Sequence, residues 1–69
     1  MVKIQLRLDK TLKNKNVSRY ELAKITGIRY QIIDNYYKNK VARYDNYVLS
    51  RICTCLDCDI SDLIETVKE

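Results

Sequence analysis

The sequence predicts a mainly α-helical domain of four to five helices, with a short two-stranded ladder that pairs its N- and C-terminal segments. Two observations lead to this fold class. Residues 2–8 alternate strictly between apolar and polar side chains, which is typical of a strand. The rest of the chain repeats apolar residues at helical spacing, and it contains no proline, low-complexity tract or internal repeat. We therefore expect one domain over residues 1–69.

The N-terminal strand needs a partner, because a lone strand leaves its backbone N–H and C=O groups unpaired. Its apolar positions are Val2, Ile4, Leu6 and Leu8. The candidate partner is the segment 63–67, and antiparallel pairing of the two ends would close the domain.

A first helix is expected to follow the strand. Leu8 and Leu12 are spaced for one face of this helix, which should end near residues 14–16. The basic residues then lie on its solvent side: Lys10, Lys13 and Lys15.

The pattern of residues 17–39 predicts two short helices joined by a tight turn, which is the arrangement of a helix-turn-helix. Ser18 followed by Glu21 is the pattern of a capping box, which marks the start of the first of these helices. Gly27 is the sole glycine of the chain, and it stands where a sharp turn favours a residue that tolerates positive φ. We expect Ile28 to pack into the angle between the two helices.

The second helix of this pair is expected to start at about Tyr30. It carries Ile33 and Tyr36 toward the core, and Ile28 and Ile32 are four residues apart. The residues left largely on the other side are Tyr30, Gln31, Asp34 and Asn35.

The last third of the chain predicts a loop, a helix and a final turn. Asn39 can adopt left-handed geometry at a helix end, and a basic loop follows it. Asp45 is a plausible N-cap for a helix that runs through Leu56, with Asp57 at a position where glycine or asparagine would be easier. A last turn around residues 60–63 would start at Asp59 or Ser61.

Charge is distributed unevenly along the chain. Residues 1–43 carry a net charge of +8 and residues 44–69 carry −4. A basic half that contains a helix-turn-helix suits a polyanion, although a solvated surface with uneven charge is the alternative. No apolar run approaches the roughly 20 residues of a membrane span and no signal peptide is evident, so we expect a cytoplasmic protein.

Cys53, Cys55 and Cys58 form a C-x-C-x-x-C pattern that invites a zinc interpretation. The apolar spacing of residues 49–56 predicts a helix, however, in which Cys53 and Cys55 project about 200° apart and cannot hold one ion. The chain has no histidine to complete a usual site. We therefore expect no metal and no cofactor, with Cys53 as a small core residue and Cys55 as an exposed or partly exposed thiol.

The sequence also offers few residues that could form a catalytic site. There is no histidine, no glycine-rich phosphate loop and no cluster of carboxylates in an apolar setting. We expect a protein that is not an enzyme.

Three segments together resemble the Cro/CI-type (Xre) helix-turn-helix family of bacterial and phage repressors, and in particular its small single-domain members. These segments are L-A-K-I-T-G-I at residues 22–28, I-I-D-N-Y-Y-K-N-K-V-A-R-Y-D at 32–45 and I-C-T-C-L-D-C-D-I-S-D-L-I-E at 52–65. The resemblance extends over nearly the entire chain, in order and with the spacing of the family.

The resemblance implies a lambda-repressor-like fold and a sequence-specific double-stranded DNA-binding transcriptional regulator, most simply a repressor, of bacterial, phage or mobile-element origin. It implies that a third helix, at about residues 29–38, enters the major groove, with a homodimer on a palindromic operator. It assigns base reading to Arg29, Tyr30, Gln31, Asp34 and Asn35. It assigns phosphate contacts to Arg19, Lys38, Lys40 and Arg43.

Several positions leave alternatives open. Asp34 either accepts a hydrogen bond from cytosine or orients Arg29 or Gln31. Arg29 stands where such proteins commonly carry a serine or threonine N-cap. Ile32 stands where a small polar residue is common, and we expect it to pack inward rather than to touch a thymine methyl group.

The tyrosines are numerous for this family, and we expect Tyr36 in the core. Tyr37, Tyr44 and Tyr47 are either plain surface or part of a dimer contact. The alternative function is a protein-interaction module of the same fold, such as an antitoxin-like or accessory factor, with a second protein as its partner.

Overall fold

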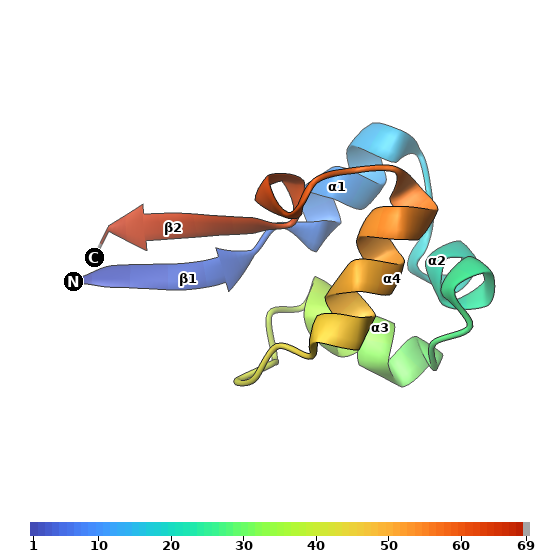
Figure 1. The fold of residues 1–69 in the computed structure, drawn as a ribbon, viewed down its shortest axis with the longest axis horizontal. Coiled ribbons are helices and arrows are strands. Elements are labelled where there is room, and N and C mark those ends of the chain that lie inside the picture. The colour runs from blue at the N-terminus through green and yellow to red at the C-terminus, as the bar shows by residue number, and fades with distance from the viewer. Residues whose placement is uncertain (69) are drawn as a thin grey trace.

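The two ends of the chain pair as the sequence predicts. The computed structural model describes residues 1–68, in which β1 (Val2–Leu6) lies antiparallel to β2 (Ile64–Lys68), with Val2 opposite Lys68 and Leu6 opposite Ile64. This two-stranded ribbon projects from one side of a helical body, and Val2 and Lys68 lie opposite each other near its tip (Figure 1).

Four α-helices and one 3₁₀ turn form the body within residues 1–68. They are α1 (Leu8–Lys15), α2 (Arg19–Thr26), α3 (Tyr30–Tyr37), α4 (Asn46–Leu56) and the 3₁₀ turn η1 (Ile60–Asp62). The predicted fold class is confirmed. Leu8 fits both the alternating pattern of the strand and the helical spacing with Leu12. The structure places it in the first helix, where it begins α1 and is almost completely buried.

The core gathers one apolar face from each element. Its buried side chains are Leu6, Leu8, Leu12, Leu22, Ile28, Ile33, Tyr36, Val48, Ile52, Leu56 and Leu63. Tyr36 is in the core as expected, and its hydroxyl group accepts a hydrogen bond from the Asp45 N–H at 2.8 Å. The Tyr36 hydroxyl group thus binds the N-cap residue of α4, while the Tyr36 ring is buried in the core.

The predicted helix ends are also present. The Ser18 hydroxyl oxygen accepts a hydrogen bond from the Glu21 N–H at 3.0 Å, and Asp45 caps α4 by accepting from the Tyr47 N–H at 2.8 Å. Gly27 has φ 73°, and Asp57 adopts left-handed geometry with φ 51°. Helices α2 and α4 therefore each begin at a side-chain cap and end at a residue with left-handed geometry.

The thiols of Cys53 and Cys58 come together at the C-terminus of α4. The Cys58 N–H donates to the Cys53 carbonyl at 3.1 Å, a backbone bond that brings their side chains against the same edge of the core. Burial raises the pKa of Cys58 to about 11, so its thiol stays protonated at neutral pH. Cys55 is half-buried.

Within residues 1–68, no group of three or more histidine, cysteine, aspartate or glutamate side chains is placed to hold a metal ion. Over the same residues, no helix is both long enough and apolar enough to cross a bilayer.

Asn39 ties the segment after α3 to the ribbon. It has φ 59°, and its side-chain amide both accepts from the Leu6 N–H at 2.7 Å and donates to the Leu6 carbonyl at 2.9 Å. These are the two bonds that a neighbouring strand would make with Leu6. One amide side chain thus stands in for a third strand at the base of the ribbon and fixes where α3 ends relative to it.

Candidate nucleic-acid interface

The turn between α2 and α3 is held by Thr26 as well as by Gly27. The Thr26 hydroxyl donates to the Leu22 carbonyl at 2.7 Å and accepts from the Ile28 N–H at 3.2 Å, so one side chain bonds to both sides of the corner. Gly27 supplies the positive φ that the corner needs. The angle between the two helices is therefore set by a short, well-bonded segment.

Arg51 of α4 secures the same corner from a distant part of the chain. Its guanidinium Nε and Nη2 atoms lie 3.3 and 3.2 Å from the Thr26 carbonyl, at the C-terminus of α2. A cation is favourable at this end of a helix because the last carbonyl groups carry partial negative charge. Sequence reasoning missed Arg51, since no local pattern links it to a carbonyl 25 residues away.

The exposed side of α3 is centred on two amide side chains. Ile33 and Tyr36 take the opposite, buried side, and at about 100° per residue this leaves Gln31 and Asn35 directed outward. The Gln31 Nε2 atom donates to the Asn35 Oδ1 atom at 3.1 Å. Gln31 keeps its carbonyl oxygen and one N–H for a further partner while Asn35 holds it in place.

The other residues predicted to read bases lie at the start of α3. Arg29 is the N-cap residue and is exposed; within residues 1–68, its side chain makes no capping hydrogen bond. Tyr30 is 43% exposed. The structure thus exposes Arg29, Tyr30 and Gln31 on the surface of α3 and its first turn, and Asn35 is half-buried beside them.

Asp34 is placed differently from these four residues. It is 9% exposed, and its two carboxylate oxygens lie 2.6 Å from Arg19 Nη1 and 3.1 Å from Lys38 Nζ. The sequence leaves open that Asp34 orients Arg29 or Gln31, but the residues that it holds are Arg19 and Lys38. Its hydrogen bond with Lys38, reinforced by Arg19, outweighs desolvation and holds the pKa of the Asp34 carboxyl below its usual value.

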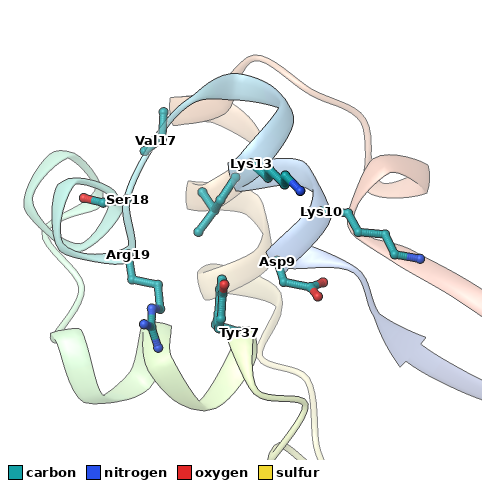
Figure 2. A pocket seen from close by; sticks show the side chains of 8 residues that line it. Asp9, Lys10, Lys13, Val17, Ser18, Arg19 and Tyr37 are labelled. Carbon is teal, nitrogen blue, oxygen red and sulfur yellow. The ribbon is translucent and has the colours of Figure 1, made fainter.

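Arg19 is held on a second side by an aromatic ring. Its guanidinium carbon lies 4.3 Å from the centroid of the Tyr37 ring, and Figure 2 shows the two side chains next to each other at the edge of a hollow of about 490 Å³. Ser18, the two cations Lys10 and Lys13, and the acidic Asp9 also line this hollow. The start of α2 therefore combines a helix N-terminus with a fixed guanidinium group, an arrangement that favours anions.

Ile32 is the clearest departure from the expected packing. We expected it to pack inward, and this prediction was wrong: its side chain is 38% exposed. Ile33 and Tyr36 already fill the inward side of α3, so Ile32 faces the segment that follows the helix. The predicted phosphate-contacting residues Lys40 and Arg43 belong to that segment and are exposed.

Three further tyrosines, Tyr44, Tyr47 and Tyr20, differ in how much of their side chain is exposed. Tyr44 is half-buried and its ring packs against Tyr36 at a centroid distance of 6.3 Å. Tyr47 is 64% exposed and Tyr20 is 72% exposed.

Comparison with known proteins agrees with this geometry. The model of the Cro/C1-type HTH DNA-binding domain matches residues 7–69. Among solved structures, a crystal structure of the transcriptional regulator VanUg is similar, with 28% sequence identity and a TM-score of 0.77 over 99% of this chain and 89% of that chain. No curated protein sequence matches the chain. The chain therefore belongs to the Cro/C1-type family of helix-turn-helix DNA-binding domains.

Proposed function

We propose that this DNA-binding regulator is a sequence-specific repressor that inserts α3 into the major groove of duplex DNA. The observation that carries the proposal is the Gln31–Asn35 amide pair at the centre of the exposed side of α3. An amide with one free carbonyl and one free N–H matches the N6 and N7 edge of adenine. The hydrogen bond to Asn35 favours one orientation of the Gln31 amide before binding, which reduces the side-chain freedom lost on binding.

Arg29 and Tyr30 extend the reading surface at the start of the helix. Arg29 is suited to guanine or to a phosphate, and the Tyr30 ring to a thymine methyl group. The exposure of both residues in the free protein supports this assignment.

Four cations are proposed to contact phosphates around this surface: Arg19, Lys38, Lys40 and Arg43. Asp34 contacts two of them directly. We assign Asp34 as a positioning residue that holds Arg19 and Lys38, and we do not assign it a base.

The proposal includes two copies of the chain on a palindromic operator, because each copy presents one reading helix. Occlusion of a promoter in the cytoplasm of a bacterium, including one that carries a phage or mobile element, would then repress transcription. This mode of action needs no cofactor and no covalent step.

The test is selection of bound duplexes from a random DNA pool, followed by fluorescence anisotropy on the selected and scrambled duplexes across a salt series. A palindromic consensus bound at least about a thousandfold more tightly than scrambled DNA is expected. Weak, salt-sensitive binding without a consensus would contradict the proposal and would favour an interaction module with a protein partner.

A further inference from the structure

A second hollow, of about 330 Å³, separates α3 from the segment that leads to α4. Ile32 lines it from α3, and Val41 and Ala42 line it from the opposite segment. Ile32 is 38% exposed, Val41 is half-buried and Ala42 is exposed, so the walls present apolar surface to solvent. Accessible apolar surface therefore lies directly beside the polar reading surface.

The rim of this hollow is basic. Lys40 and Arg43 line it and are exposed. Asp45 also lines the hollow, but its carboxylate accepts hydrogen bonds from the Tyr47 and Val48 N–H groups at the start of α4. Within residues 1–68, neither Lys40 nor Arg43 forms an ion pair with Asp45. The hollow therefore combines apolar walls with two exposed cations, and this combination suits a small apolar group attached to a polyanion.

Ile32 also lies beside the residues proposed to read bases. It follows Gln31 directly, and Asn35, one turn further along α3, lines the same hollow. The one apolar group that base pairs present in the major groove is the C5-methyl group of thymine. An apolar side chain next to Gln31 would meet the edge of the same base pair or of its neighbour.

We propose that Ile32, with Val41 and Ala42, forms a binding subsite for the C5-methyl group of one thymine in the operator, while Lys40 and Arg43 contact phosphates beside it. This inference rests on the proposed function, because it requires α3 in the major groove. It adds a specificity-determining residue that sequence reasoning placed in the core.

The experiment replaces each thymine of the selected operator, one at a time, by deoxyuridine, which lacks only the methyl group. Affinity is measured by fluorescence anisotropy for the full chain and for the variants Ile32→Ala and Ile32→Val. At one thymine per half-site, the replacement should weaken binding by the unaltered protein about fourfold, the equivalent of one buried methyl group.

The two variants separate methyl recognition from a general effect on α3. Ile32→Ala should bind the thymine and deoxyuridine operators equally at that position, whereas Ile32→Val, which keeps a branched side chain, should retain most of the difference. Circular dichroism melting identifies a variant that fails to fold. If Ile32→Ala does not fold, the test is the affinity of Ile32→Val for the thymine operator compared with its affinity for the deoxyuridine operator.

The inference is wrong if a specific consensus emerges but no single replacement changes affinity, or if Ile32→Ala keeps the full difference. The same holds if the consensus has no thymine in either half-site. If no consensus emerges at all, the proposed function fails first, and the selection step alone reveals this.

Discussion

The Arg19 guanidinium group donates to the Asp34 carboxylate at 2.6 Å, and so joins the first residue of α2 to the middle of α3. The same carboxylate contacts Lys38, the residue that directly follows α3. One buried carboxylate thus holds two cations, one at the start of α2 and one directly after α3. Several expectations follow from this pair and from the contacts around it.

Replacing Asp34 by asparagine should lower DNA specificity while raising affinity for random DNA. The change releases Arg19 and Lys38 from their common anchor and removes one negative charge from a surface that faces phosphates. Anisotropy titrations on the selected and scrambled duplexes measure both quantities. Glu21→Gln is the matched control, because it removes the same charge from an exposed position of α2 and should leave the ratio of the two affinities nearly unchanged.

The stability of the protein should fall in acid partly because of Asp34. Its folded-state pKa is lowered, chiefly by the hydrogen bond with Lys38, so its contribution is present above the usual carboxyl pKa and is lost as pH falls through the lower folded-state value. Urea unfolding at pH 7 and at successive values below pH 4 should show a smaller acid loss for Asp34→Asn than for the unaltered chain. Equal losses would mean that this carboxylate does not contribute.

Gln31→Ala and Arg19→Ala should weaken DNA binding in different ways. Gln31→Ala is expected to cost about 1 to 3 kcal/mol on the selected operator and little on random DNA, since it removes a base contact. Arg19→Ala should weaken binding to both, because a phosphate contact does not depend on sequence. Equal losses on the two DNAs for Gln31→Ala would contradict its assignment as a base-reading residue.

Asn39 should contribute to stability in two separable ways. Asn39→Gly keeps the left-handed backbone but loses both hydrogen bonds to Leu6, at an expected cost of about 1 to 3 kcal/mol. Asn39→Ala should cost roughly 1 kcal/mol more, because its Cβ atom disfavours φ 59°. Urea denaturation of the two variants gives both values. If the alanine variant were as stable as the glycine variant, the backbone part of this explanation would be wrong.

The amino-acid sequence by itself determined the elements and their ends. Ser18, Gly27 and Asp45 mark helix boundaries through bonds or backbone angles that involve residues within a few positions, so they could be predicted. Ile33 and Tyr36 were expected in the core because helical spacing alone shows which side of α3 is apolar. The pairing of the two ends was predictable because the N-terminal strand had one candidate partner.

The tertiary structure decided which elements lie opposite one another, and with this the details of the candidate site. The Arg19 contact of Asp34, the Leu6 contact of Asn39 and the Thr26 contact of Arg51 each join residues at least 15 positions apart in the sequence. Ile32 is exposed because two other side chains of α3 occupy its inward side. Periodicity records which side of a helix is apolar, but the docking of distant elements decides which polar group each side chain meets.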